Sequence, residues 1–301
     1  MISVVIPHRN QPNALLRVVR ALQAQRDPRN PFEIIVTDNG SDKPMPQDIT
    51  AYPNVSVVHE TQPGPGPARN RGALHASGSI LAFIDADCIP ERNWLKEIAQ
   101  HFYRPNAAGV IGGDVRIIPR GQKLTAIEAY ESIFGYRFEL YIKRDRFAGT
   151  GNLAMRRDIF QSVGPFGGIE VAEDRDWGQR ASRAGFPPVY IPRMIVYTEA
   201  RRNFPELARK WDRHVAHEFA AVQTAGQKLL YFGRSLAILG SPLVEIPRVA
   251  TSKRLSNRRA KVLAWCILVR IRLFRARRMW ALLLGADPRA LAIRWYKRDP
   301  D

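Results

Sequence analysis

The chain has few cysteines and lacks the features of a secreted protein. Only Cys88 and Cys266 occur among its 301 residues, and neither belongs to a Cys-x-x-Cys or Cys/His ligand spacing. This argues against a disulfide framework or a structural zinc site and indicates a reducing compartment. The amino terminus also lacks the basic segment and long apolar stretch of a signal peptide, so residues 2–6 are expected to form a first β-strand.

Positive charge is plentiful but unevenly distributed. The net charge is +18; residues 201–301 contain 22 Lys and Arg against 7 Asp and Glu, a balance of +15, whereas residues 1–200 contain 24 against 21, a balance of +3. We therefore expect a nearly neutral catalytic domain, 1–200, followed by a basic and mainly helical region, 201–301, with the boundary near 198–205 or 240–250. A hydrophobic content of 45% suffices for a sizeable core.

Strand and helix patterns alternate from the first residue onward. The apolar runs 2–6, 33–37, 55–58 and 80–84 read as strands, and 13–25 and 68–77 have helical spacing between them. This alternation predicts an α/β fold with a doubly wound, mostly parallel sheet. Further along, the expected elements are a helix at 91–103, a strand-rich segment at 109–118, helices at 124–144 and 173–184, and a strand at 188–197.

The acidic tripeptide Asp85-Ala86-Asp87 closes the predicted strand 80–84. In an extended chain, residues two apart point to the same side, so the two carboxylates repel each other unless a cation lies beside them. Ligands of open α/β sheets bind beyond the carboxyl ends of strands, and carboxylates, a diphosphate and Mg²⁺ or Mn²⁺ are chemically matched. An acidic turn is the plain alternative, but the position after an apolar strand favours a cation bound with a diphosphate.

Two other polar sites suggest nucleotide contacts. Asp38 closes the second strand, where its carboxylate could accept hydrogen bonds from a nucleobase or a ribose, or could form an Asx-turn with Asn39-Gly40. Arg69 and Arg71 stand at a helix start, where they could supply positive charge for a phosphate or simply form a solvated basic turn.

The pair Glu173-Asp174 opens a predicted helix. A carboxylate there is stabilised by the helix dipole, which explains simple capping, but near a sugar donor it could also act as a general base toward an attacking hydroxyl. Asn152 and Trp177 could position an acceptor together with Glu173, or be a turn residue and a core aromatic.

Six short segments occur in one fixed order within residues 1–200. Together they resemble the family 2 glycosyltransferases. They are Ser3-Val4-Val5-Ile6-Pro7 with Arg9-Asn10, Val36-Thr37-Asp38-Asn39-Gly40-Ser41, Pro67-Ala68-Arg69-Asn70-Arg71-Gly72, Phe83-Ile84-Asp85-Ala86-Asp87, Gly151-Asn152 and Glu173-Asp174-Arg175-Asp176.

This resemblance implies a GT-A fold, a nucleoside-diphosphate sugar donor of the UDP or GDP type, Mn²⁺ or Mg²⁺, and inversion at the anomeric carbon. It implies that Asp174 is the catalytic base and that Asp87, with Asp85, binds the metal. The residues that it places at the nucleotide are Pro7, Arg9, Asp38, Arg69, Asp85 and Asp87.

One position departs from the family pattern. After the strand that ends near residue 197, many members have a histidine able to complete the metal site, whereas this chain has Tyr197-Thr198-Glu199. Glu199, His214 or His217 could replace it, or the metal could rely on Asp87, the diphosphate and water.

The segment 246–286 contains no acidic residue and attracts anionic partners. Its longest uninterrupted apolar run, 262–269, is far shorter than the roughly 18 residues of a membrane-spanning helix. The apolar residues recur every three or four positions, so the helix could pack on the catalytic body or lie on an anionic membrane surface. The proposed stripe consists of Val262, Cys266, Val269, Leu273, Ala276, Trp280 and Leu283.

These patterns predict an inverting, metal-dependent glycosyltransferase that acts on a saccharide or lipid-linked acceptor. We expect it to be cytoplasmic and peripheral on the inner face of the membrane. A sugar-phosphate nucleotidyltransferase is a rival, but it would carry a glycine-rich basic loop where this chain has Pro7-His8-Arg9-Asn10. A nucleic-acid-binding protein would explain the charge but not the acidic motifs, so nucleic acid is a disfavoured partner.

Overall fold

The structure, a computed structural model, describes residues 1–25 and 30–288. The chain forms two compact units. The first unit contains residues 1–116 and 137–199, and the second contains 117–136 and the described residues from 200 onward. Each unit has its own buried apolar clusters.

The first unit is built on a curled sheet with the strand order β3-β2-β1-β4-β7-β6-β8-β5. Strands β3, β2, β1 and β4 are parallel, whereas β7 runs antiparallel to both β4 and β6. The expected α/β fold with its doubly wound, mostly parallel sheet and helical C-terminal region is confirmed. The strands are β1 (Ile2–His8), β2 (Phe32–Asp38), β3 (Val55–His59), β4 (Ile80–Ile84), β5 (Cys88–Pro90), β6 (Val110–Ile118), β7 (Asn152–Arg156) and β8 (Val189–Glu199).

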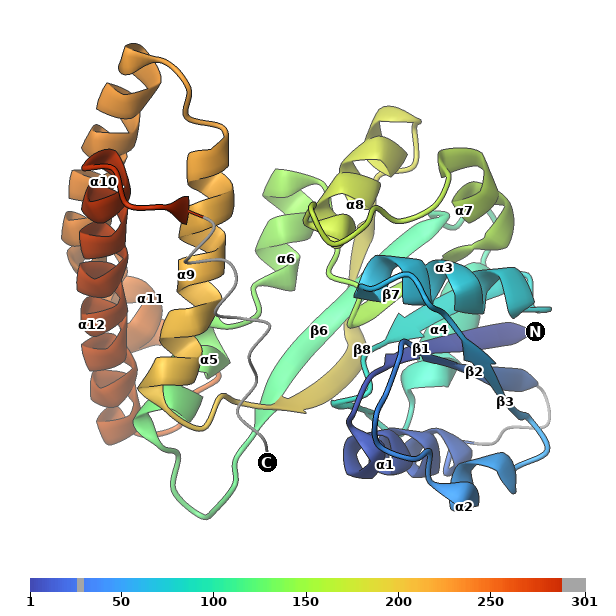
Figure 1. Cartoon of the computed structure of the whole chain (residues 1–301). Coiled ribbons are helices and arrows are strands. Elements are labelled where there is room, and N and C mark those ends of the chain that lie inside the picture. The colour runs from blue at the N-terminus through green and yellow to red at the C-terminus, as the bar shows by residue number, and fades with distance from the viewer. Residues whose placement is uncertain (26–29, 289–301) are drawn as a thin grey trace. The chain divides into compact units, whose positions relative to one another are not determined.

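Helices cover both faces of this sheet (Figure 1). Side chains alternate along each strand, so Val5 and Phe83 share one face, where they pack with Trp177 of α8. The opposite face is covered by α1, which buries Leu15 and Leu22. The helices of this unit are α1 (Pro12–Gln23), α2 (Gln47–Thr50), α3 (Pro65–His75), α4 (Trp94–Phe102), α6 (Phe138–Leu140), the π-helical turn η1 (Tyr141–Asp145), α7 (Arg157–Val163) and α8 (Glu173–Arg183).

The prediction of one continuous helix over 124–144 is wrong. Helix α5 spans Ala126–Phe134 and ends at Gly135, after which the chain passes from the second unit to the first. A Cβ at residue 135 would lie 2.7 Å from the Glu131 carbonyl oxygen, so the tight backbone at this exit suits glycine.

The second unit is helical. Ile127 and Ile133 of α5 pack with Leu207, Ile267 and Leu268, so the segment 117–136 joins the C-terminal region rather than the sheet. The sequence predicts this segment within the catalytic domain, 1–200, because nothing local distinguishes an apolar face that packs on α12 from one that packs on a sheet. The other helices are α9 (Phe204–Ala220), α10 (Ala225–Val244), α11 (Ile246–Thr251) and α12 (Arg258–Leu283).

The apolar stripe predicted on α12 coincides only in part with the face that packs, since Ala276 of the stripe is buried. Val262 and Leu273 are exposed, whereas the packed face includes Ala264, Ile267 and Ile271. The helix is apolar on more than one side, so spacing alone predicted only part of the packed face.

Candidate active site

The carboxyl ends of β1, β2 and β4 meet at one edge of the parallel sheet. Pro7 lies opposite Thr37 and His8 opposite Asp38 in the β1–β2 register, and β4 ends next to β1 with Asp85 directly after it. Arg9 follows β1 and is exposed. The sheet therefore brings four residues expected at the nucleotide to the edge at which open α/β sheets bind ligands.

The Asp85-Ala86-Asp87 motif forms a group with potential metal ligands. The nearest ligand atoms of Asp85, Asp87 and Cys88 all lie within 4.8 Å of one another. Burial raises the pKa of the Cys88 thiol well above its ordinary value, and the carboxylates of Asp87 and Asp85 raise it further. Two carboxylates next to a protonated thiol suit a hard cation such as Mg²⁺ or Mn²⁺. The sequence alone did not predict Cys88 as a metal ligand. Its position directly after Asp87 is the feature of the sequence that indicates it.

The pairing of β5 with β8 shows which residue lies next to Asp85, Asp87 and Cys88. Antiparallel pairing of β5 with β8 places Thr198 opposite Cys88. Glu199, one of the proposed substitutes for the family histidine, forms an ion pair with Arg17 at 3.3 Å. His214 and His217 belong to α9 in the other unit, and the His217 side chain is not among those that the structure describes.

Arg69 connects the acidic motif of β4 to the start of α8. Its guanidinium donates from Nη2 to Asp85 Oδ1 at 2.7 Å and from Nη1 to Glu173 Oε1 at 3.0 Å. Burial alone would lower the pKa of Arg69, but the two carboxylates outweigh that effect and raise it. With 4% of its side chain exposed, Arg69 is a fixed internal cation between two acidic groups.

Asp174, at the start of α8, has a raised pKa. Its pKa is raised from 3.8 to about 6, chiefly by burial and also by the negative charges of Glu173 and Asp85. The Arg175 backbone N–H, which donates to Asp174 Oδ1 at 2.7 Å, and the Arg69 cation limit this rise. A carboxylate with a pKa near 6 is matched to accepting a proton at neutral pH.

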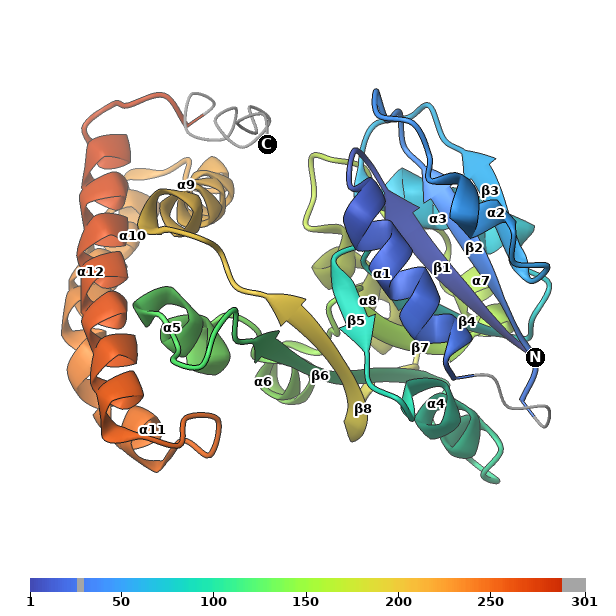
Figure 2. The same ribbon diagram turned by 90° about the horizontal axis from the view of Figure 1, so that it is seen from below.

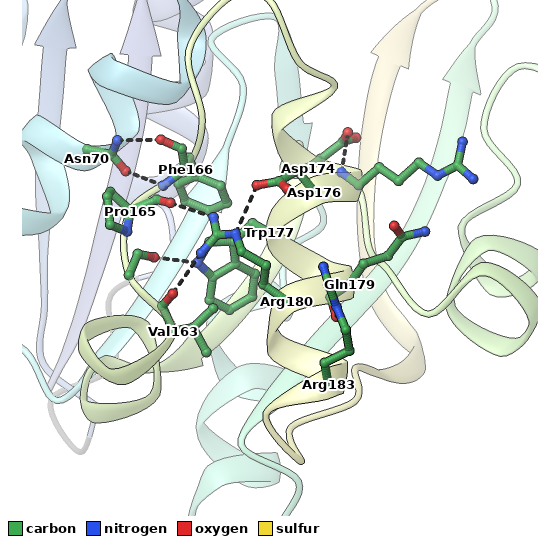
Figure 3. A network of polar contacts seen from close by, with 12 residues as sticks. Asn70, Val163, Pro165, Phe166, Asp174, Asp176, Trp177, Gln179, Arg180 and Arg183 are labelled. Atoms are coloured by element: carbon green, nitrogen blue, oxygen red, sulfur yellow. Dashed lines mark hydrogen bonds and ion pairs between the residues drawn. The ribbon is translucent and has the colours of Figure 1, made fainter. Parts of the chain in front are cut away.

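The start of α8 is held in place by Arg180 (Figure 3). Its guanidinium donates to the carbonyl oxygens of Val163 at 2.7 Å and Pro165 at 2.6 Å, and its Nε donates to Asp176 at 2.9 Å. One arginine thus fixes the segment that leads into α8 and also the first turn of the helix.

Two further side chains hold the same segment, residues 163–166. Trp177 Nε1 donates to the Gly164 carbonyl oxygen at 2.9 Å. The Asn70 side chain of α3 accepts from the Phe166 N–H at 2.8 Å and donates to the Phe166 carbonyl oxygen at 2.9 Å (Figure 3). The loop therefore ties α8, which carries Asp174, to α3, which carries Arg69.

The three residues tentatively assigned to the acceptor, Asn152, Glu173 and Trp177, differ in burial. Trp177 is 1% exposed and lies in the core, and Asn152 is fully buried. The Asn152 amide accepts from Trp94 Nε1 and donates to the carbonyl oxygens of Asp114 and Met194, each at 2.8 Å. Both side chains are therefore buried and hydrogen-bonded within the protein, and their tentative assignment to the acceptor stays a prediction. Glu173 is partly exposed and bound to Arg69.

The sequence predicts for Asp38 either a nucleotide contact or a local turn, and the structure shows a local turn. Its carboxylate accepts from the Ser41 hydroxyl and from the Ser41 N–H, the latter at 3.3 Å, and Gly40 has a φ of +71°. Ser41 is the partner rather than the Asn39-Gly40 backbone. The position at the end of β2 leaves Asp38 beside the edge that carries Asp85.

Comparisons with known proteins agree with this geometry. Residues 3–164 match the family described as Glycosyl transferase family 2. Glycosyltransferase AglE of Haloferax volcanii is 33% identical over 216 residues, which cover 69% of this chain and 70% of that protein. The pre-mycofactocin glycosyltransferase of Mycobacterium tuberculosis is 29% identical over 218 residues, 69% of this chain and 45% of that protein.

Solved structures share the fold. The mannosyltransferase PcManGT of Pyrobaculum calidifontis, in complex with GDP-Man and Mn²⁺, has a TM-score of 0.60 at 16% identity, with 94% of this chain and 87% of that chain covered. S. aureus TarS 1-349, in complex with UDP-GlcNAc, has a TM-score of 0.51 at 16% identity, with 98% and 91% covered.

Sheet, acidic motif and comparisons together define a glycosyltransferase with a GT-A-type fold. The chain belongs to glycosyl transferase family 2.

Proposed function

We propose that this chain transfers a sugar, with inversion at the anomeric carbon, from a nucleoside-diphosphate donor of the UDP or GDP type to a hydroxyl of a saccharide or lipid-linked acceptor. The observation that carries this proposal is Asp174, whose pKa is raised to about 6 at the start of α8, next to Glu173, which is bound through Arg69 to Asp85. A single general base suits one direct attack of the acceptor hydroxyl on the anomeric carbon, and one direct displacement inverts that carbon.

Each residue has a distinct role in this mechanism. Asp174 removes the proton from the acceptor hydroxyl as its oxygen attacks the anomeric carbon. Asp87 and Asp85 would hold Mn²⁺ or Mg²⁺, which neutralises the departing diphosphate when bound. Arg69 keeps Asp85 and Glu173 oriented, and its fixed charge also favours the diphosphate. Pro7, Arg9 and Asp38 line the nucleotide.

The separation of donor binding from transfer tests these roles. Thermal stabilisation by UDP and GDP, with and without Mn²⁺, reports donor binding. We expect Asp87→Ala to lose the Mn²⁺-dependent stabilisation, and Asp174→Asn to retain it while transfer falls by about 10³-fold. Transfer by Asp174→Asn at the wild-type rate would refute the assigned base. The anomeric configuration of the product, read by NMR, tests inversion.

Location and partners extend the proposal. The basic segment 246–286 would supply positive charge toward an anionic membrane surface, with the enzyme cytoplasmic and peripheral on the inner face. A lipid-linked acceptor would then be presented at that surface. Nucleic acid remains a disfavoured partner, because the acidic residues at the sheet edge belong to the nearly neutral first 200 residues.

A further inference from the structure

Helix α10 exposes an apolar face that no other described element of the second unit covers. The helical stretch Ala225–Thr251 is long and apolar enough to cross a membrane by length and composition, yet only 22% of its most apolar 18-residue window is buried. An ordinary core helix of that composition would be mostly buried. The exposed large apolar residues are Leu229, Leu230, Phe232, Leu236, Leu243, Val244 and Ile246.

The other side of α10 is already occupied. Tyr231, Ser235 and Ile238 are buried, and α10 runs alongside α12 within the second unit (Figures 1 and 2). Trp280 Nε1 of α12 donates to Ser235 Oγ at 2.7 Å. Leu229, Leu236 and Leu243 recur every seven positions, which places them on one side of the helix. Rotation of α10 cannot bury this side without exposing the packed one.

The charge around this face selects its partner. Glu245 is the single acidic residue between Phe219 and Ala286, and it pairs with Arg248 at 2.5 Å. The chain that follows α10 adds exposed basic residues at the turn into α12. They are Lys253, Arg254, Arg258 and Arg259. A leucine-rich face followed by a basic turn matches the apolar interior and anionic headgroups of a bilayer.

We propose that α10 lies in the interface of an anionic membrane, with Leu229, Leu236 and Leu243 inserted among the acyl chains and Arg258 and Arg259 at the headgroups. This deepens the membrane contact proposed above, because it moves the apolar contact from the α12 stripe to a helix outside 246–286. A second copy of the chain is a poorer occupant, since it would bring two strongly basic surfaces together.

Vesicle binding by the full chain tests this surface. Co-sedimentation is measured with vesicles of phosphatidylcholine alone and of phosphatidylcholine mixed with phosphatidylglycerol. We expect binding to the mixed vesicles and a loss of about 10-fold or more in Leu229→Ser/Leu236→Ser/Leu243→Ser. Leu74→Ser is the matched control, because Leu74 is 77% exposed on α3 in the other unit. Arg258→Glu/Arg259→Glu should lose the preference for anionic vesicles.

Three kinds of outcome would overturn the proposal. The first is a vesicle result, either wild-type binding by the triple-leucine variant or no binding by the wild type. The second is a dimer in light scattering that the leucine substitutions dissociate, since the face would then be covered by a second copy. The third is resistance to alkaline carbonate extraction from membranes, which would mean that the stretch 225–251 spans the bilayer. Release of nucleoside diphosphate from UDP- and GDP-sugars is followed in parallel, so that failure of the enzymatic proposal is seen separately.

Discussion

Arg69 on α3 joins two acidic residues that are 88 positions apart in the sequence, Asp85 and Glu173, with N–O distances of 2.7 and 3.0 Å. This bridge links the proposed metal-binding motif, Asp85-Ala86-Asp87, to the helix that carries the proposed base. A planar guanidinium can serve both carboxylates at once, whereas the ammonium of a lysine is a single point charge.

Arg69→Lys should therefore reduce the rate although the charge is retained. Loss of one of the two bonds frees Glu173 or Asp85, and a displacement of about 1 Å near the reacting groups costs about 10²-fold in kcat. Steady-state kinetics measures this effect. Arg71→Lys is the matched control, because Arg71 is exposed on the same helix and should keep its activity within about twofold. Equal rates for both variants would contradict the bridge.

The raised pKa of Asp174 predicts an acid limb in the rate profile. The base must be deprotonated to accept a proton, so kcat/KM should fall tenfold per pH unit below about pH 6 and level off above it. Asp174→Glu, which keeps a carboxylate in a different place, should move the midpoint of this limb. A wild-type profile that stays flat from pH 5 to pH 7, or a limb near the ordinary value of 3.8, would exclude Asp174 as the titrating group.

The raised pKa of Asp174 also predicts that this residue lowers the folding stability at neutral pH. Because the folded-state pKa is raised from 3.8 to about 6, the favourable contribution of Asp174 is complete below about pH 4 and is lost as the pH rises through 6. Asp174→Asn should then raise the melting temperature by about 2 to 4 °C at neutral pH and by less near pH 4. Differential scanning calorimetry at both pH values measures this. Asp48→Asn, at an exposed ion pair, should show no such rise.

Local patterns predicted the sheet edge well. The apolar runs before Asp38 and Asp85 predicted strands β2 and β4 and the acidic side chains at their carboxyl ends. Strand order in a parallel α/β unit leaves few alternatives, so these ends could be expected to meet at one edge. The Arg69 bridge could not be predicted in this way, since no spacing rule relates residue 69 to residue 173.

Sequence alone is least informative where tertiary burial decides between local alternatives. Trp177 and Asn152 have functional groups suited to substrates, but tertiary packing directs them to Gly164 and Trp94. On α12 apolar residues lie on more than one side, and contacts with α5 and α10 bury Ile267 and Ile271, which the predicted stripe leaves out, together with Ala276, which belongs to it. Neither outcome can be read from a single segment of sequence.

Arg180 should act as a positioning residue. Arg180→Met removes the bonds to Val163 and Pro165 and frees the start of α8, so kcat should fall by about 10-fold or more with little change in the KM for the donor. Arg183→Met is the matched control, one turn away on the same helix and exposed (Figure 3). If Arg180→Met lowered the melting temperature but left kcat unchanged, the hydrogen bonds of Arg180 would stabilise the fold without positioning the base.

Gly151 should be intolerant of even one methyl group, because a Cβ there would lie 2.8 Å from Asp85 Oδ2 and 3.9 Å from Cys88 Sγ. The carboxylate would have to move, and Asp85 is also the partner of Arg69, so Gly151→Ala should disturb the metal group and the bridge together. We expect the Mn²⁺ concentration for half-maximal activity to rise about 10-fold while far-UV circular dichroism is unchanged. Gly121→Ala, where a Cβ would meet nothing within 4 Å, serves as the control. If Gly151→Ala kept the wild-type Mn²⁺ dependence, Asp85 would not depend on the space that this glycine leaves, and Asp87 would be the main protein ligand.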